Sequence, residues 1–341
     1  MKIGKFNLEK DGVFIIAEMS ANHNGNLENA LATIKAAKEI GANAIKLQTY
    51  TADTLTLKSN KQDFVVSGGT IWDGITLHEL YNKAYTPWEW HKELFEYARN
   101  IGIDIFSSPF DKSAVDFLEQ FNPSAYKIAS FEITDYELVR YTASKKRPII
   151  ISTGIATNDE IEDVIKICKN EGNYDIILLK CTSAYPAPPQ DANLLTIPDL
   201  AEKFDVISGF SDHTLGDIAP ITAVALGAKV LEKHFILDKS IGGPDSEFSL
   251  DKKDFKKMIS SVRTAEKLLG EVSYEMTDKK IKSRQFARSL YVSRSIKKGE
   301  KFSKENIRSV RPGYGMHPKK LKDMIGKTAN KDFEIGDRLK E

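Results

Sequence analysis

Two histidines follow separate apolar runs in the second half of the sequence. His213 ends the segment that begins at Val206, and His234 ends the segment that begins at Lys229. Both runs have the composition of buried parallel strands, and the Ala/Gly-rich stretch between them suits a crossover helix. Adjacent parallel strands end at the same side of a sheet, and neutral imidazole is a common ligand for divalent transition metals. The pair therefore predicts a metal site, with two separate hydrogen-bonded core histidines as the alternative.

Polar side chains also end the other predicted strands. Lysines supply charge and hydroxyl groups supply directed hydrogen bonds, so together they could hold an anion that carries phosphate and carboxylate groups. Carboxylates among them could bind sugar hydroxyls or act as acid and base. A single serine is weak evidence, because serine is a common helix N-cap, and the prediction depends on the whole set. The set is Glu18, Lys46, Gln48, Ser107, Ser108, Lys127, Ser130, Glu132, Ser152, Thr153, Ser183, Tyr185, Ser211, His213 and His234.

Eight strand–helix repeats would bring these strand ends together. Helical spacing separates the strands, as at 27–40, which ends before Gly41. No G-x-G-x-x-G follows the first strand, so we predict a (β/α)8 TIM barrel, with a doubly wound open sheet as the alternative. In a closed barrel alternate residues point inward, which directs Lys46 and Gln48 toward the lumen. The predicted strands are 13–18, 44–49, 104–110, 125–130, 148–154, 176–183, 206–213 and 229–234.

The chain of 341 residues exceeds the roughly 250 residues of a typical barrel. We predict a catalytic barrel at 1–270, a charged linker at 271–285 and a small, mostly β module at 286–341. A module of this size is marginal alone, so we expect it to dock on a barrel. The polar segment 51–85, with Gly68, Gly69, Trp72 and Tyr81, is predicted to be a long loop with a short helix. It either forms part of a lid over the site or is a surface insertion with no role in the site.

The overall composition argues against several classes of partner. A net charge of +1, from 49 basic and 48 acidic residues, offers no basic excess for nucleic acid or an anionic membrane. Neither a signal-peptide pattern nor a membrane-spanning apolar run is present. Cys168 and Cys181 give no disulfide framework, and no G-x-S-x-G elbow indicates a serine hydrolase. We expect a cytoplasmic protein.

The motifs at the strand ends resemble those of the sialic acid synthase family, whose members condense phosphoenolpyruvate with an N-acetylated sugar. The resemblance covers essentially the whole chain, and the C-terminal module resembles the antifreeze-like (SAF) domain of these enzymes. Segments 17–23 and 248–251 resemble the pseudaminic acid synthase branch, since other branches more often carry an Ile/Ala-Gly pair at Met19 and Ser20. The motifs are Glu18, Asn22-His23-x-Gly25, Lys46-x-Gln48, Lys127-Ile128-Ala129-Ser130-x-Glu132, Ser152-Thr153-Gly154, Cys181-Thr182-Ser183-x-Tyr185-Pro186, Gly209-x-Ser211-Asp212-His213, Glu232-Lys233-His234 and Arg311-Pro312-Gly313.

The resemblance implies a site with four groups of residues. Acid–base and catalytic roles fall to Glu18, Glu132, His213 and His234, and the two histidines would hold a divalent ion such as Mn²⁺, Mg²⁺ or Co²⁺. The phosphate of phosphoenolpyruvate would contact Lys127, Ser130, Ser152, Ser183 and Ser211, although some bacterial members carry Asn at position 183. Its carboxylate would contact Lys46 and either Ser107 or Ser108. The sugar would contact Gln48, Glu132, Tyr185, Asp245, Phe286 and Arg311.

The resemblance also implies the reaction and the assembly. Carbon 3 of phosphoenolpyruvate would attack the metal-polarised aldehyde of 2,4-diacetamido-2,4,6-trideoxy-L-altrose, and water at carbon 2 would release phosphate by C–O cleavage to leave pseudaminic acid. Synthesis of N-acetylneuraminic or N,N'-diacetyllegionaminic acid is the enzymatic alternative. A carbohydrate or sugar-phosphate binding protein is the non-enzymatic alternative. In the family the SAF module is swapped across a two-fold dimer, so we expect a homodimer in which Arg311 reaches the partner's sugar.

Overall fold

The computed structural model describes residues 1–67 and 73–340, which form two compact units, Met1–Gly270 and Glu271–Glu341. Gly68, Gly69 and Trp72 of the predicted insertion lie outside the described residues. Among the described residues, no helix combines the length and apolar character needed to cross a membrane.

The first unit is a closed barrel of parallel strands. The last strand pairs with the first, so that each strand has two neighbours. This closure confirms the predicted (β/α)8 class and excludes the open doubly wound sheet. The strands are nearly continuous apolar runs because both of their faces are covered. In order around the barrel they are β3 (Phe14–Glu18), β4 (Ala44–Thr49), β5 (Asp104–Pro109), β6 (Tyr126–Ile128), β7 (Ile149–Ser152), β8 (Ile176–Cys181), β9 (Ile207–Asp212) and β10 (Val230–His234).

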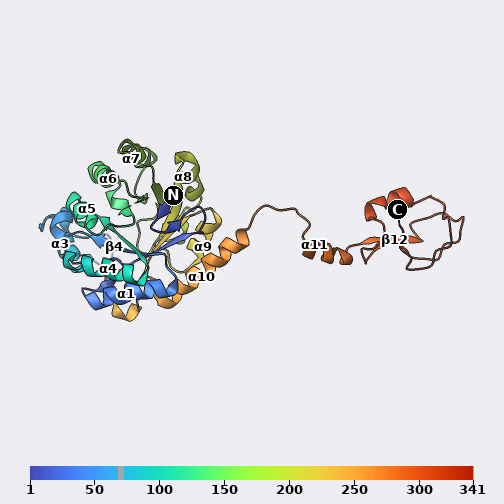
Figure 1. Cartoon of the computed structure of the whole chain (residues 1–341), viewed down its shortest axis with the longest axis horizontal. Helices are drawn as coiled ribbons and strands as arrows, with labels where there is room; N and C mark the ends of the chain where they lie inside the picture. Colours follow the sequence, from blue (N-terminus) through green and yellow to red (C-terminus); the bar gives the residue numbers. More distant parts are fainter. Residues whose placement is uncertain (68–72, 341) are drawn as a thin grey trace. The chain divides into compact units, whose positions relative to one another are not determined.

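Helices surround the barrel and cover its outer face (Figure 1). The first of them begins where the Asn26 side chain accepts a hydrogen bond from the backbone N–H of Asn29, and it ends at Gly41, whose φ of 91° few other residues adopt. Their apolar faces pack on the outward-facing strand residues, such as Ile15 and Ile45. The helices are α1 (Leu27–Ile40), α4 (His91–Ile101), α5 (Lys112–Glu119), α6 (Tyr136–Ala143), α7 (Asn158–Asn170), α8 (Thr196–Phe204), α9 (Ile218–Ala225) and α10 (Lys252–Leu269).

Apolar residues fill the barrel at the end where its strands begin. Inward-facing Phe14, Phe106 and Ile150 form one buried cluster there with Ile3 and Leu8. Ile3 belongs to a short N-terminal hairpin of β1 (Lys2–Ile3) and β2 (Phe6–Asn7), and Leu8 follows it directly; the sequence analysis did not predict this hairpin. The hairpin closes this end of the barrel with apolar side chains, which leaves the opposite end for polar groups.

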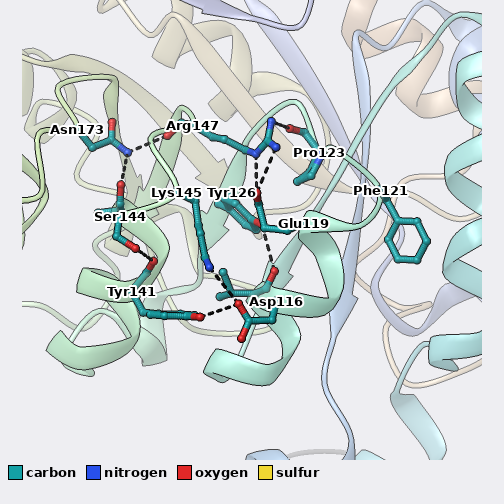
Figure 2. A network of polar contacts seen from close by, with 12 residues as sticks. Asp116, Glu119, Phe121, Pro123, Tyr126, Tyr141, Ser144, Lys145, Arg147 and Asn173 are labelled. Carbon is teal, nitrogen blue, oxygen red and sulfur yellow. Dashed lines mark hydrogen bonds and ion pairs between the residues drawn. The ribbon is translucent and has the colours of Figure 1, made fainter.

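A network of polar side chains ties α5 and α6 to the starts of β6 and β7 (Figure 2). Glu119 accepts hydrogen bonds from the Tyr126 hydroxyl at 2.7 Å and from two nitrogens of Arg147 at 2.8 and 3.3 Å. Asp116 accepts from Tyr141 at 2.6 Å and from Lys145 at 3.0 Å. The network lies where the strands begin, the face of such barrels that contributes stability and not chemistry.

The segment between β4 and α4 is ordered where it is described. It contains α2 (Ala52–Leu55), a short 3-10 turn (Gln62–Phe64) and α3 (Leu77–Ala84), so two helices replace the one predicted. Capping boxes at Thr51 and Thr76 start both helices.

The second unit has its own small core, formed by Leu290, Val292, Ile296, Phe302 and Ile307 among others. Two antiparallel strands, β11 (Ser289–Val292) and β12 (Ile307–Val310), and a single-turn helix, α12 (Leu321–Met324), build it. The segment predicted to be a linker contains a short helix, α11 (Asp278–Ser283), none of whose residues is buried. The Thr277 side chain caps this helix, which the charge pattern of the segment did not indicate.

Candidate active site

Alternation along the strands separates two layers inside the barrel. In β10, Val230 belongs to the inner apolar cluster, and Glu232 and His234 follow it at intervals of two residues. In β3, Phe14 and Ile16 precede Glu18 in the same way. Because side chains two apart share a face, each inward series changes from apolar to polar toward the strand end. The polar inward residues are Glu18, Lys46, Gln48, Ser108, Lys127, Ser152, Cys181, Ser211, Glu232 and His234.

Four charged side chains meet in the lumen, and each is at most 5% exposed. Lys46 Nζ lies 2.5 Å from Glu18 Oε2 and 3.8 Å from Glu232 Oε1. Lys127 Nζ lies 3.3 Å from the same Glu232 oxygen. The Ser211 hydroxyl donates to that oxygen at 3.3 Å. Glu232 therefore bridges the two lysines, while Glu18 pairs with Lys46 alone.

The two carboxylates of this cluster differ in acidity. Burial raises the pKa of Glu18 to about 7, although Lys46 acts in the opposite direction. Burial also acts to raise the pKa of Glu232, but Lys127 and Lys46 outweigh it and the net pKa lies below its usual value. Near neutral pH, part of the Glu18 population is protonated while Glu232 stays ionised. Burial lowers the pKa of Lys127, so the charge of the cluster depends on the protonation of this lysine as well as on that of Glu18.

Hydroxyl groups line the lumen beside the lysines. Ser130 Oγ accepts a hydrogen bond from the backbone N–H of Gly154 at 3.1 Å. A Cβ atom at Gly154 would collide with the hydroxyls of Ser183 and Ser130, so only glycine leaves them this space. Within the described part of the chain, the buried hydroxyls of Ser152 and Ser183 have no hydrogen-bond partner. Buried polar groups are normally hydrogen-bonded, and these two are free to bind a ligand oxygen.

Of the two serines offered for the carboxylate contact, Ser107 does not face the lumen. Its hydroxyl lies 2.6 Å from that of Thr49, which in turn lies 2.8 Å from His91 Nε2 on α4. This chain of contacts runs between the barrel and its helices. The adjacent Ser108 faces the opposite way, and its hydroxyl accepts from Lys46 Nζ at 3.2 Å. The sequence analysis left both serines open, and the geometry favours Ser108.

The two histidines lie together at the barrel mouth, with ring centroids 5.4 Å apart. His213 Nδ1 donates to the Thr182 carbonyl at 2.9 Å, which leaves its Nε2 lone pair available. Burial lowers the pKa of His234 well below its usual value, so this ring is neutral, and its Nδ1 has no hydrogen-bond partner. Burial also acts to lower the pKa of His213, but contact with Cys181 outweighs it and the net pKa lies above its usual value. A divalent ion would bind the neutral form of both rings, so binding at His213 would release a proton. Among residues 1–67 and 73–340, no group of three or more His, Cys, Asp or Glu side chains surrounds a metal position.

A cavity of about 470 Å³ opens beside the histidines. Its polar lining includes Gln48, Glu132, Tyr185, His234 and Asp245. Apolar side chains of segment 51–85 and of the loops after the strands, such as Phe131 and Phe248, complete it. From the described parts of segment 51–85, the residues that line this cavity are Leu55, Val66, Leu77, Leu80, Tyr81 and Ala84. Of the residues predicted to contact a sugar, Gln48, Glu132, Tyr185 and Asp245 line this cavity, together with His234, which was predicted to hold the metal.

The carboxylates at the cavity mouth have different surroundings. Gln48 donates to Glu18 Oε1 at 3.0 Å, so Glu18 is held between Gln48 and Lys46. Glu132 Oε2 has no hydrogen-bond partner in the described structure, and burial raises the pKa of Glu132 to about 7. Burial also raises the pKa of Asp245, which accepts from the backbone N–H of Ala21 at 3.3 Å. Of these three, Glu132 has the greatest freedom to exchange a proton.

Sequence reasoning missed the central position of Glu232. The Glu232-Lys233-His234 motif was recognised, but only the histidine was given a role. The signal that could have identified Glu232 is its position two residues before His234, because side chains two apart in a strand point the same way. Lys233 faces outward, where its ammonium lies 2.5 Å from Asp212 Oδ2. Cys181 was also left without a role, although its sulfur lies 3.9 Å from His213 Nδ1.

Two of the predicted sugar contacts belong to the second unit. Phe286 ends a 3-10 turn (Arg284–Phe286) and is 63% exposed. Arg311 follows β12 and is also exposed to solvent. Both are therefore accessible on their own unit.

Comparisons with known proteins cover the whole chain. The NeuB family matches residues 33–274, and the SAF domain matches residues 287–340. A Campylobacter jejuni protein named pseudaminic acid synthase is 57% identical over 341 residues, covering 100% of this chain and 99% of that protein. An N,N'-diacetyllegionaminic acid synthase of Legionella pneumophila is 38% identical, covering 96% and 93%. The structure of an N-acetylneuraminic acid synthetase from Leptospira borgpetersenii has a TM-score of 0.74 and 31% identity, covering 83% of this chain and 94% of that one.

Proposed function

This chain belongs to the NeuB family, and on that premise we propose that it condenses phosphoenolpyruvate with 2,4-diacetamido-2,4,6-trideoxy-L-altrose and water to give pseudaminic acid and phosphate. The observation that carries the proposal is the 57% identity over the full length of a pseudaminic acid synthase, against 38% for a legionaminic acid synthase. The lumen with its lysines and the adjacent cavity supply sites for two substrates. The enzyme is a transferase. Its two free cysteines suit a reducing compartment, and we assign it to the cytoplasm.

Phosphoenolpyruvate would bind in the lumen. Lys127 and the unpartnered hydroxyls of Ser152 and Ser183 would hold its phosphate, together with Ser130 and Ser211. Lys46 and Ser108 would hold its carboxylate, because these two are already joined by a hydrogen bond. Charge-assisted hydrogen bonds of this kind are stronger than neutral ones. Both lysines are buried, so water would screen their charge poorly.

A divalent ion, Mn²⁺, Mg²⁺ or Co²⁺, would be held by His213 and His234, whose free ring nitrogens and shared position fit this group. When bound, such an ion supplies Lewis-acid polarisation of the sugar aldehyde. The protein offers two imidazoles, so substrate and water oxygens would complete the ligand set.

The chain's own residues would bind, orient and move protons. The lumen holds phosphoenolpyruvate with carbon 3 free to bond with the aldehyde carbon of the sugar, whose oxygen gains a proton. Water then adds to carbon 2 with loss of one proton, which balances the proton gained by the aldehyde oxygen. The bond between carbon 2 and the phosphate oxygen breaks with its electron pair going to phosphate, and the hydroxyl left by the water passes its remaining proton to the departing phosphate as its oxygen forms the keto group. We assign the proton of this water to Glu132, since its Oε2 has no partner and its pKa is about 7. Glu18, held by Lys46 and Gln48, would position Lys46 instead.

The substrate assignment is tested by phosphate release from phosphoenolpyruvate. Each candidate sugar is offered in turn with the metal-loaded enzyme: the trideoxy altrose sugar, its legionaminic counterpart and N-acetylmannosamine. We expect the highest kcat/KM for the altrose sugar. A higher value for either competitor would reassign the enzyme to that branch. Binding of the sugars without phosphate release from any of them would favour a carbohydrate-binding protein.

We further propose a homodimer in which the C-terminal module is exchanged between protomers, so that Arg311 contacts the sugar in the other barrel. The proposal rests on the family resemblance and on the exposure of Arg311 and Phe286. Mixing two inactive variants, Arg311→Ala and His213→Ala, under conditions of subunit exchange tests it. Exchanged modules create one intact site in each mixed dimer, so activity returns. Mixed dimers that form and remain inactive would contradict the exchange.

A further inference from the structure

Helix α3 has one apolar face, and this face lines the cavity beside the active site. Leu77, Leu80, Tyr81 and Ala84 stand at helical positions i, i+3, i+4 and i+7, which share one side of a helix. All four line the cavity, and no residue of α3 is buried in the core. An amphipathic helix normally buries such a face against other elements. Here the face is half-buried and turned toward the substrate cavity.

Polar contacts on the other side of α3 hold the helix in place. His78 Nε2 lies 2.9 Å from Asp53 Oδ1 of α2. The Thr76 hydroxyl accepts from the backbone N–H of Glu79, and the Glu79 carboxylate accepts from the backbone N–H of Thr76. The backbone N–H of Val66 donates to the Ile75 carbonyl at 2.9 Å. The apolar face is therefore held by hydrogen bonds before any ligand arrives.

The cavity is lined by both polar and apolar side chains. Glu132, His234 and Asp245 are among the polar ones and come from the barrel strands and the loops that follow them. Leu55 and Val66 line the cavity together with the apolar face of α3. A sugar whose aldehyde lies beside His234 would place other carbons against these aliphatic side chains.

We infer that the wall formed by Leu55, Val66, Leu77 and Leu80 selects an amino sugar whose terminal carbon is a methyl group and disfavours one with a terminal hydroxyl. The inference rests on the proposed function and deepens it. Leucine and valine side chains offer no hydrogen-bond partner, so a hydroxyl buried against them loses its water without replacement. Hydrophobic pockets discriminate against an added hydroxyl by on the order of 100-fold.

The test compares two sugars that differ at one position. They are 2,4-diacetamido-2,4,6-trideoxy-L-altrose and its counterpart with a hydroxyl at carbon 6, each assayed for kcat/KM at saturating phosphoenolpyruvate. For the unchanged enzyme we expect a ratio of about 10 to 100 in favour of the methyl sugar. Leu80→Asn places an amide of similar size in the wall, and it should lower the ratio at least about tenfold while leaving the KM for phosphoenolpyruvate unchanged. Lys83→Gln, on the exposed face of the same helix, is the matched control and should keep the original ratio.

The outcomes separate this inference from the proposed function. Turnover of both altrose sugars with a ratio near one in the unchanged enzyme would overturn the selective wall but retain the proposed function. A preference for N-acetylmannosamine over both would overturn the proposed function itself. The selective wall would also be overturned as an explanation if Leu80→Asn left the ratio of kcat/KM values unaltered while circular dichroism showed a folded protein. If Leu80→Asn does not fold, Leu77→Asn and the ratio of the unchanged enzyme decide the question.

Discussion

Replacement of Lys46 by methionine should destabilise the fold far more than the same replacement at Lys127. Lys46 is the ion-pair partner of Glu18 at 2.5 Å and also lies 3.8 Å from Glu232. Lys127 pairs with Glu232 alone, at 3.3 Å. Without Lys46, Glu18 is a buried carboxyl without an ion-pair partner, and only the more distant Lys127 still acts on its pKa. Without Lys127, Glu232 retains Lys46 and the Ser211 hydroxyl.

The size of this difference follows from the distances. With an effective dielectric constant of about 20, Coulomb's law gives an attraction of about 7 kcal/mol for the 2.5 Å contact and about 5 kcal/mol for the 3.3 Å contact. Desolvation of the ions offsets much of this, and removal of one partner from a buried pair typically costs about 3–5 kcal/mol. We expect that cost for Lys46→Met and about 1–2 kcal/mol for Lys127→Met, because Glu232 retains a second cation.

The pH dependence gives the Lys46 variant a second signature. The pKa of Glu18 is already raised from 4.5 to about 7 by burial, and loss of Lys46 raises it further. In the variant, Glu18 therefore binds more protons in the folded state than in the unfolded state from pH 4.5 to beyond pH 7. The stability of the variant falls as the pH rises through this whole range. The deficit of Lys46→Met relative to the unchanged protein should therefore be larger at pH 8 than at pH 6.

Urea unfolding of both single variants and of the double variant Glu18→Gln/Lys46→Met measures these effects, and calorimetry measures phosphoenolpyruvate binding. Glu18→Gln should restore most of the stability lost in Lys46→Met, because the buried charge is gone. It should not restore phosphoenolpyruvate affinity, since the cation is still absent. Equal stability of the two lysine variants, or a double variant no more stable than Lys46→Met, would refute the reasoning.

Three further outcomes are expected. Because burial raises the pKa of Glu132 to about 7, kcat/KM for the sugar should fall as the pH drops below about 7. Glu132→Gln should abolish this pH dependence and lower kcat by about 100-fold or more. If the variant keeps the pH dependence, another residue is the base. Arg147→Met breaks the partly exposed ion pair with Glu119 and should lower the free energy of unfolding in urea by about 1 kcal/mol. It should leave kcat/KM unchanged, since the pair lies where the strands begin. A change in kcat/KM would contradict a purely structural role. Chelation should abolish activity and Mn²⁺ should restore it, while His213→Ala and His234→Ala should each lose bound metal by elemental analysis; full activity in metal-free protein would exclude the metal.

The fold class and the polar strand ends were predictable from local patterns. Eight apolar runs alternating with helical spacing leave few arrangements other than a closed barrel, which the structure confirms. Lys46 and Lys127 were predicted to meet because parallel strands of one barrel end at a common mouth, and both lie against Glu232.

The choice between neighbouring residues of a strand required the tertiary structure. Strands of a parallel barrel are apolar on both faces, so the sequence does not reveal which alternate set points inward. That ambiguity left Ser107 beside Ser108 as a candidate and left Glu232 without a role. Closure of the barrel decides both cases, because the direction of every side chain in a strand follows once one residue is placed.

Contacts between segments far apart in the chain were also beyond the sequence. A helix of eight residues, such as Leu77–Ala84, is marginal alone, and its apolar spacing gives no indication of what the face contacts. The residue types of the chemistry, lysine, serine, histidine and carboxylate at the strand ends, were determined by the sequence. Their charge balance and the apolar wall beside them were decided by tertiary packing, because burial and distance between side chains exist only in the folded chain.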